Sequence, residues 1–256
     1  MKRSVSSAHR AFSIVCAVIL SVFLLSPAVS ASSVRRDLLG RNTVFTAVLY
    51  DSLNGLPTSE ANAIAQTEDG FIWIGGYSGL TRYDGTEFFH FDSKSGISSV
   101  YSLFTDSRDR LWIGTNEDGV ACFDHGDITL FGRVEPLRSY SVRDMTEDDE
   151  GNIIIATTQG LAYVDAQTNE IHLLDDPQLN NDYITVLEND GFGKVYGLTL
   201  DGAVFEIESL RITAYYEASA FATENIINEL YPDPDREGVL YMGTAGAELI
   251  TADMNG

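Results

Sequence analysis

A repeat of about 42 residues runs through most of this sequence, and it constrains the fold more strongly than any other feature. A short apolar segment that ends at a small residue occurs five times, and we place that residue at Gly75, Gly114, Ala156, Gly197 and Gly243. The steps between these positions are 39, 42, 41 and 46 residues. Copies with so little drift predict one supersecondary unit that is stacked on itself.

Each copy has the pattern of four short strands joined by turns. In the first copy, an alternating segment at 63–66 is followed by an acidic turn at 68–70 and by a strand that contains Trp73. A third strand at 79–84 and a fourth at 87–91 complete the unit. Gly and Asp tolerate the backbone conformations that such tight turns need. Four antiparallel strands in about 42 residues are the size of one propeller blade, so we predict an all-β propeller of four-stranded blades.

The blade boundaries follow from the period. After residue 31 there is no helical apolar period, which excludes a parallel α/β sheet. The predicted blades cover residues 57–96, 97–136, 137–178, 179–222 and 223–256.

Residues 43–50 match the fourth strand of a blade that lacks its first three strands. We expect this orphan strand to pair with the incomplete last blade, because that pairing removes an exposed sheet edge. Two arrangements are open from the residues alone: five blades that close on themselves, or part of a larger ring.

The first 31 residues differ in kind from the rest and predict a signal peptide. Lys2, Arg3 and Arg10 precede an apolar stretch at 11–25, and small residues at 28–31 form a cleavage signature. A transmembrane helix needs about 20 apolar residues, so we favour a cleaved signal over an uncleaved anchor. Residues 32–42 are predicted to be a linker. The propeller is therefore expected to be exported, to the periplasm or the cell surface.

The chain is strongly acidic, with 38 Asp and Glu against 16 Lys and Arg and a formal net charge of −22. This balance argues against a nucleic-acid partner, because phosphate binding needs clustered Lys and Arg. The simplest consequence of the acidity is solubility. Cys122 is the single thiol after the predicted signal peptide, and we interpret it as a small residue packed in a strand rather than a reactive group.

The first two copies carry a distinctive pair of motifs. Ile-Trp-Ile-Gly stands at 72–75 and Leu-Trp-Ile-Gly-Thr at 111–115, while Gly-Leu-Thr-Arg-Tyr-Asp follows the first of them at 79–84. These residues resemble the repeat of the two-component regulator propeller family, whose strand Leu-Trp-Ile-Gly-Thr is followed by Gly-Leu-x-Arg-Tyr-Asp. The resemblance covers residues 43 to about 253 and is strongest over 53–124.

The resemblance implies a function. Members of that family usually form the extracytoplasmic sensor of a membrane-bound histidine kinase or diguanylate cyclase, and their propellers typically have seven blades. We therefore expect a ligand- or partner-sensing domain that forms part of a larger ring and precedes a membrane-linked output domain. The alternatives are a secreted binding or scaffold propeller and, less favoured, an extracellular propeller lyase or hydrolase.

Few residues point to chemistry. Trp73 and Trp112 occupy matching repeat positions and are expected to fill the wedge between blades. The turn around Asp233 imitates the start of a calcium loop, but it coincides with the ordinary turn of the repeat. No catalytic pair, metal site or cofactor motif stands out, so we predict a chain that is not itself an enzyme.

The remaining site is geometric. Propellers bring the loops between second and third strands, and the linkers between blades, to one end of the channel. In this chain those loops offer polar and aromatic side chains that suit a sugar or peptide ligand, namely Ser59, Tyr77, Asn116, Tyr140, Gln159 and Asn181.

Overall fold

The computed structural model describes residues 32–36, 42–57, 60–91, 95–131 and 137–255. The chain divides into two compact units, residues 1–49 and 50–256. The predicted signal peptide at 1–31 and the candidate Ser59 lie outside the described residues. No helix within the described residues is long and apolar enough to cross a membrane.

The first unit contains a two-stranded antiparallel sheet that differs from expectation. Strand β1 (Ser32–Arg36) lies in the predicted linker, and it pairs with β2 (Asn42–Thr46). The predicted orphan strand at 43–50 is thus a strand only as far as Thr46, and its partner is β1. The fifth sheet of the second unit consists of three strands, β19 to β21. Pairing across a short loop costs less entropy than pairing between segments about 200 residues apart, which explains the local partner.

The all-β prediction is confirmed in the second unit, where four sheets have four strands and one has three. Every sheet is an antiparallel meander in chain order. The first sheet contains β3 (Ala63–Gln66), β4 (Ile72–Gly76), β5 (Gly79–Tyr83) and β6 (Phe88–Phe91). The second contains β7 (Val100–Thr105), β8 (Leu111–Thr115), β9 (Val120–Asp124) and β10 (Asp127–Leu130). The third contains β11 (Val142–Glu147), β12 (Ile153–Thr157), β13 (Leu161–Val164) and β14 (Ile171–Leu174).

The last two sheets follow the same order. The fourth contains β15 (Ile184–Asn189), β16 (Val195–Thr199), β17 (Val204–Glu208) and β18 (Arg211–Tyr216). The short helix η2 (Ala218–Phe221) leads to the fifth, which contains β19 (Ile227–Pro232), β20 (Val239–Thr244) and β21 (Leu249–Asp253). Each sheet falls inside one of the predicted blade ranges.

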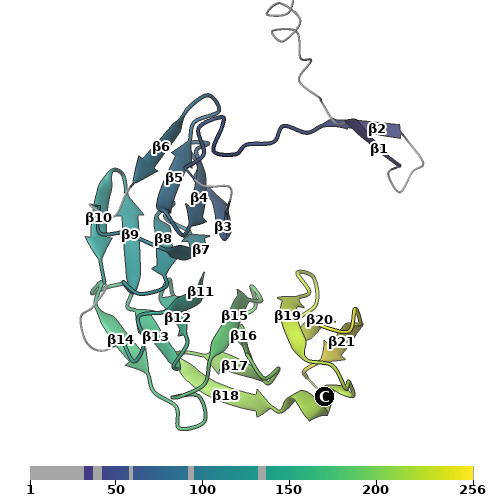
Figure 1. Cartoon of the computed structure of the whole chain (residues 1–256). Coiled ribbons are helices and arrows are strands. Elements are labelled where there is room, and N and C mark those ends of the chain that lie inside the picture. Colours follow the sequence, from purple (N-terminus) through teal and green to yellow (C-terminus); the bar gives the residue numbers. More distant parts are fainter. Residues whose placement is uncertain (1–31, 37–41, 58–59, 92–94, 132–136, 256) are drawn as a thin grey trace, which may run out of the picture. The chain divides into compact units, whose positions relative to one another are not determined.

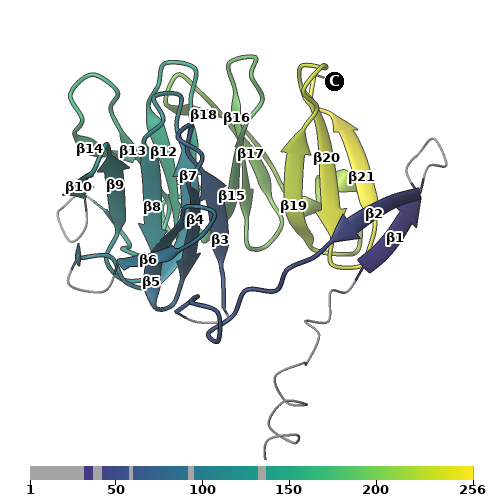
Figure 2. The same ribbon diagram turned by 90° about the horizontal axis from the view of Figure 1, so that it is seen from above.

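The sheets stand side by side like the blades of a propeller. Contacts join the first strand of each sheet to the first strand of the next, from β3 through β7, β11 and β15 to β19. Figure 1 shows the five sheets following one another along an arc, with these first strands on its inner side. Figure 2, seen at right angles, shows the antiparallel strands of most blades lying roughly along one common axis. The first strands therefore line the centre of the arc.

The core lies between the blades. Trp73 is 1% exposed and packs against Leu111 and Ile113 of the second sheet. Trp112 is fully buried and packs against the third sheet in the same way. The small residue of the repeat makes room for the next blade, because a Cβ added at Gly75 would lie 2.4 Å from Cγ1 of Val100. At Gly114, an added Cβ would lie 2.7 Å from the equivalent atom of Val142.

The fourth copy is out of register with our alignment by one residue. In the second sheet the pairing register shifts by one residue near the start of β7, and Gly114 pairs with Ser102, the first residue after the shift. In the fourth sheet the first residue after the matching shift is Val186, and it pairs with Leu198 instead of Gly197. The steps of the small-residue position are thus 39, 42, 42 and 45 from Gly75 to Gly243. Gly197 is a glycine for a different reason: a Cβ there would lie 2.0 Å from the ring of Phe205 on the neighbouring strand.

The two end sheets expose positions that the other sheets bury. Leu249 is 75% exposed, whereas Leu80, Val120, Leu161 and Val204 occupy the same register position and are at most 2% exposed. Those four side chains pack in the interfaces between successive sheets. On the first sheet, Ile64 is 71% exposed. The residues at the same register position of the other four sheets lie in or against the core between sheets, namely Leu103, Met145, Leu187 and Leu230. The outer faces of the first and last sheets thus each expose an apolar side chain at a position that lies in a blade interface elsewhere.

Candidate functional site

A bulge recurs near the start of the inner strands. The pairing register shifts between Val100 and Ser102, and again at matching points in the third, fourth and fifth sheets. The extra residues are Tyr101, Arg143, Thr185 and Asn228. A bulge redirects the side chain of its extra residue and is frequent next to functional sites. Four of the five blades thus place a redirected side chain at the same level of their inner strands, while β3 of the first blade pairs without a shift.

These bulges lie at the end of the sheets where blade linkers meet the loops between second and third strands. We call this end the mouth, defined by the four bulge residues and the loops at 116–119, 158–160, 200–203 and 245–248. Backbone bonds repeat there from blade to blade: Asn116 N donates to Ser99 O, Thr158 N to Ser141 O, and Leu200 N to Tyr183 O. The repeated bonds fix the loops of the mouth against the inner strands.

Three blades meet in a cluster around Arg143, which we call the mouth cluster: Tyr101, Asn116, Arg143 and Tyr183. The guanidinium carbon lies 4.4 Å from the ring centroid of Tyr101 and 5.3 Å from that of Tyr183. Nε donates to the Tyr183 hydroxyl at 2.5 Å, and Nη1 donates to Asn116 Oδ1 at 2.8 Å. Asn116 Nδ2 in turn donates to Ser99 Oγ at 2.9 Å. Arg143 is therefore held by neutral groups on both sides.

The charge of Arg143 is not compensated by a carboxylate within the part of the chain that the structure describes. Other cations there form ion pairs, such as Arg110 with Asp106 and Lys194 with Glu206. A guanidinium between two aromatic rings is stabilised by cation–π attraction while it keeps its positive charge. The mouth cluster therefore holds one guanidinium that no described carboxylate pairs with, in a mouth whose loops also carry acidic residues such as Glu117 and Asp201.

The neighbouring carboxyl group of Asp144 does not pair with Arg143. It accepts the backbone N–H of Met145 at 2.9 Å and that of Leu187 on the next blade at 2.8 Å. Burial raises the pKa of Asp144 to about 7, and the negative charges of Glu188 and Glu229 act in the same direction. The Leu187 and Met145 N–H groups oppose this rise. Asp144 thus links two inner strands with a carboxyl group that titrates near neutrality.

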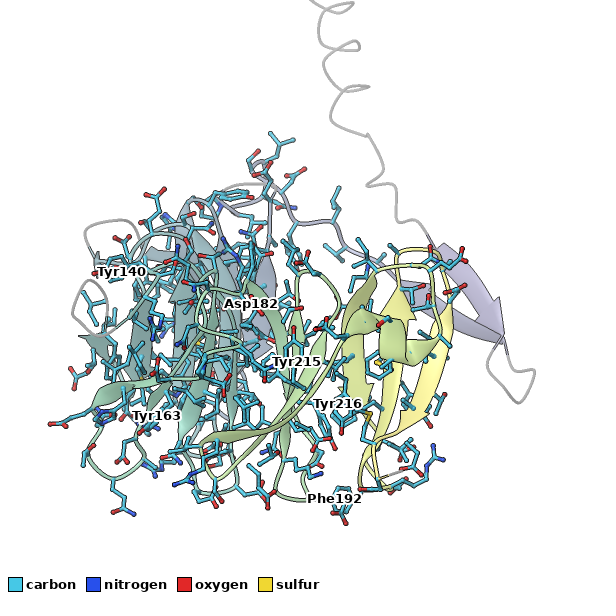
Figure 3. All side chains as sticks on the ribbon, turned by 90° about the horizontal axis from the view of Figure 1, so that it is seen from below. Tyr140, Tyr163, Asp182, Phe192, Tyr215 and Tyr216 are labelled. Atoms are coloured by element: carbon cyan, nitrogen blue, oxygen red, sulfur yellow. The ribbon has the colours of Figure 1, made fainter. Side chains whose placement is uncertain are left out.

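Of the predicted site residues that the structure describes, Asn116 and Gln159 lie in the mouth loops, Tyr77 lies in the corresponding loop of the first blade, Tyr140 and Asn181 lie in the linkers between blades, and Asn116 alone belongs to the cluster. Tyr77 is 58% exposed between β4 and β5, and Gln159 lies in the loop before β13. Tyr140 accepts a bond from Gly119 N through its carbonyl, and Asn181 precedes Asp182, whose carbonyl accepts from Gly160 N. Figure 3 labels Tyr140 and Asp182, and it places Asp182 and Phe192 toward opposite ends of the fourth sheet.

The sequence analysis missed Tyr101, Arg143 and Tyr183. A weak signal existed, since Arg143 is the one cation in the strand Val-Arg-Asp-Met-Thr-Glu that leads into the third copy. The bulge that redirects it depends on strand pairing, which the sequence does not display.

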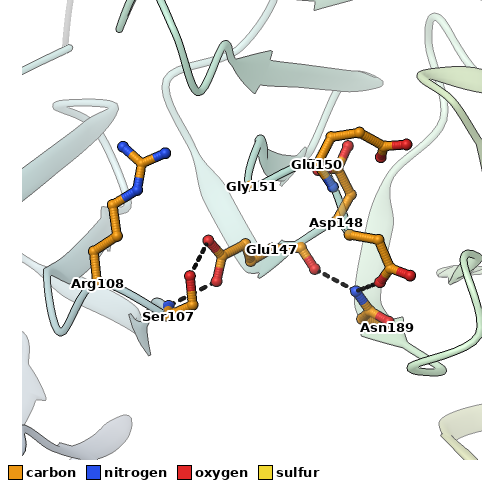
Figure 4. A pocket seen from close by; sticks show the side chains of 8 residues that line it. Ser107, Arg108, Glu147, Asp148, Glu150, Gly151 and Asn189 are labelled. Carbon is orange, nitrogen blue, oxygen red and sulfur yellow. Dashed lines mark hydrogen bonds between the residues drawn. The ribbon is translucent and has the colours of Figure 1, made fainter.

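The opposite end of the blades carries an acidic recess of about 560 Å³, shown in Figure 4. Glu147 accepts bonds from Ser107 N and Oγ at 2.7 and 2.8 Å, and Asn189 Nδ2 donates to Glu147 O at 2.7 Å. These bonds join the turns of three adjacent blades. No group of three or more His, Cys, Asp or Glu suited to a metal ion occurs among the residues the structure describes. The recess is explained as a junction between turns.

The turn around Asp233 also has a structural role, within its own blade. Asp233 accepts bonds from the Arg236 guanidinium and, at 2.9 Å, from the Tyr241 hydroxyl. The charged Arg236 holds the pKa of Asp233 at about 2. Asp106 accepts from the indole of Trp112 at 2.8 Å in an equivalent way. These carboxylates anchor the aromatic residue of their own blade.

We compared the sequence and the fold of this chain with those of known proteins. Residues 55–78 and 95–117 match the profile of the family described as two component regulator propeller. No curated protein sequence matches the chain. Among solved structures, the chain is similar to the extracellular domain of a proposed hybrid two component system from B. thetaiotaomicron, with 22% identity and a TM-score of 0.55. A second such domain from the same organism matches with 17% identity and a TM-score of 0.65.

A lyase shares the fold as well. Virginiamycin B lyase from Staphylococcus aureus matches with 13% identity and a TM-score of 0.64, over 87% of this chain and 73% of the lyase. The two extracellular domains match over 76% and 84% of this chain, but the chain spans only 26% and 32% of their lengths. At these identities the likeness shows the fold. The chain has the β-propeller architecture, and two of its segments match the two component regulator propeller family.

Proposed function

We propose that this chain is the extracytoplasmic sensing propeller of a membrane signalling receptor and that it binds its ligand at the mouth cluster. Two arguments support this: the two segments that match the two component regulator propeller family, and a mouth that presents one Arg between two Tyr rings. The ligand is a saccharide or a peptide. Aromatic rings and a few oriented polar groups suit both, because they stack on apolar surface and fix polar atoms.

Binding at the mouth can reach the rest of the domain through the inner strands. Arg143 contacts residues of the second, third and fourth blades, so a ligand on it touches three blade interfaces at once. A ligand that favours one arrangement of these blades shifts the population toward it. In the receptor, a downstream membrane segment and a histidine kinase or diguanylate cyclase would read that shift.

Ligand screening tests the binding part of this proposal. The full chain is screened by thermal shift against oligosaccharides and peptides, and we expect some of them to raise the melting temperature, since a ligand that binds only the folded state stabilises it. Tyr101→Ala is expected to reduce the shift, whereas Phe192→Ala, exposed at the other end of the fourth sheet, leaves it unchanged. A shift that Phe192→Ala removes and Tyr101→Ala preserves would place binding elsewhere.

Export is tested separately. Residues 1–256 are fused to an alkaline phosphatase that is active only outside the cytoplasm, and we expect activity together with an N-terminus near residue 32. An inactive fusion would contradict both the sensor function and the alternative of a secreted binding propeller. The sensor function and the secreted binding propeller differ in signalling output. Phosphorylation of a response regulator, or a change in cyclic-di-GMP, that depends on Tyr101 would support the sensor function.

We also propose that the chain is not itself an enzyme. The described histidines lie away from the mouth: His90 is on β6, His125 is in the turn before β10, and His172 is on β14. The mouth cluster offers a permanent cation, an amide and two phenols, and the adjacent carboxyl group of Asp144 directs both oxygens to backbone N–H groups and not to the cluster. Turnover of any bound saccharide or peptide by the purified chain would contradict this proposal.

A further inference from the structure

The guanidinium of Arg143 has one nitrogen, Nη2, that no described residue accepts from. Nε is bonded to Tyr183 Oη, and Nη1 is bonded to Asn116 Oδ1 and, at 3.2 Å, to Val142 O. None of the hydrogen bonds among the described residues uses Nη2. Nη2 is not among the fully buried polar atoms that lack a partner, so at least part of its surface is accessible. An Arg whose Nε and Nη1 are fixed, and whose Nη2 is unbonded, is preorganised to donate from Nη2 to an acceptor group.

The fixed partners leave the positive charge intact. Asn116, Tyr183 and Val142 accept as neutral groups, although the chain has more than twice as many acidic as basic residues, 38 against 16. The adjacent Asp144 directs both carboxyl oxygens to backbone N–H groups. Arg110 and Arg236 each pair with an Asp, whereas Arg82 packs against the rings of Phe71 and Phe89 without an ion pair among the described residues. The charge of Arg143, which no described carboxylate neutralises, is thus available to an anionic group outside the described chain.

The rings on either side define what can approach. Tyr101 covers the guanidinium at 4.4 Å and is itself 39% exposed, and it comes from the bulge of the neighbouring inner strand. A planar anionic group that accepts from Nη2 would lie beside the Tyr183 hydroxyl, which already accepts from Nε. Charge-assisted hydrogen bonds of this kind are short and about twice as strong as neutral ones.

We infer that the ligand of the mouth cluster carries a carboxylate and that Arg143 Nη2 donates to it, beside the ring of Tyr101. The inference rests on the proposed binding at the mouth and adds the chemical class. Such a carboxylate occurs on uronic-acid units of a saccharide or at the C-terminus of a peptide. The net charge of −22 repels anions at long range, so recognition depends on this local cation and not on the overall field.

Isothermal titration of the full chain separates the sources and tests the inference. The saccharide arm compares a galacturonate trimer with its methyl ester, and the peptide arm compares a tripeptide with its C-terminal amide. We expect the free acid of one arm to bind at least about tenfold more tightly than its neutral partner, as loss of a charged hydrogen bond implies. Arg143→Gln removes that preference, and Arg143→Lys, which keeps the charge but not the planar fork, restores part of it. Circular dichroism and melting temperature establish that both variants are folded.

Other outcomes overturn the inference. Three results contradict it. The acid and neutral forms bind equally, or the preference for the acid survives Arg143→Gln, or neither acid binds at a concentration of about 10 mM. Failure of the proposed function is distinguishable from failure of the inference. If a neutral saccharide or peptide binds and Tyr101→Ala weakens it, binding at the mouth stands and the carboxylate does not.

Discussion

Leu161 and Leu249 form a matched pair that tests the packing of the blades. Both lie at the first paired position of a third strand, but Leu161 is 2% exposed and Leu249 is 75% exposed. Leu161 packs in the interface between the third and fourth blades, together with Leu179, Leu187 and Ile184. The same substitution at two equivalent positions therefore isolates the contribution of the blade interface.

We expect Leu161→Ala to lower the free energy of unfolding by about 2–5 kcal/mol, because it removes buried methyl groups and leaves a cavity. Leu249→Ala is expected to change it by no more than about 0.5 kcal/mol, as is usual for an exposed side chain. For a domain of this size, each kcal/mol corresponds to a shift of roughly 2–4 °C in melting temperature. The difference between the two variants is thus at least several degrees.

Chemical denaturation and calorimetry measure this difference. Both are recorded at several protein concentrations, since association through the exposed face would make the melting temperature of the parent chain depend on concentration. A cost below about 0.5 kcal/mol for Leu161→Ala would refute the packing described between blades. A cost for Leu249→Ala similar to that for Leu161→Ala would show that the outer face of the fifth blade is covered in solution.

Three further outcomes follow from the structure. Gly197→Ala is expected to destabilise by about 1–3 kcal/mol because its Cβ meets the ring of Phe205, whereas Gly243→Ala, whose Cβ would lie 3.7 Å from its nearest neighbour, is tolerated; equal melting temperatures of the two variants would contradict this. The pKa of Asp144 in the folded state, about 7, is above its value in the unfolded chain, so folding favours the protonated carboxyl group. The free energy of unfolding therefore falls as the pH rises from about 4 to 7, by up to ~1.4 kcal/mol per pH unit. Asp144→Asn should therefore gain in melting temperature relative to the parent chain at pH 8 compared with pH 5, and a constant difference across this range would refute the shift. Burial raises the pKa of Cys122 to about 12, so a thiol reagent at pH 8 should label the native chain far more slowly than the denatured chain, and equal rates would contradict its burial.

Period and strand pattern were sufficient to predict the blades. The motif with Trp73 and its copy with Trp112 predicted both the strands and the aromatic wedge, since a repeated unit must bury the same face in each copy. The fourth copy was aligned one residue off because Gly197 imitates the small residue of the other copies. Its real cause, the ring of Phe205 on the next strand, is a contact that a single strand does not reveal.

The candidate site was less accessible from sequence. Loop positions at the mouth could be inferred from the order of strands, which is how Asn116 was found. Arg143 and Tyr101 were missed because they lie inside strands, and only a bulge turns them toward the mouth. The local hairpin at 32–46 was missed for the opposite reason: its second strand resembles a blade strand, although its partner lies next to it in sequence.

Hydrogen exchange of the full chain, with and without the ligand that gives the largest thermal shift, tests most directly the claim that this propeller binds at its mouth. We predict protection of amides around Tyr101, at 116–119, around Arg143 and at 183–185, where the bulges and the mouth loops meet. Protection confined to the turns at 106–110, 148–152 and 190–194 would place binding at the opposite end and contradict the account.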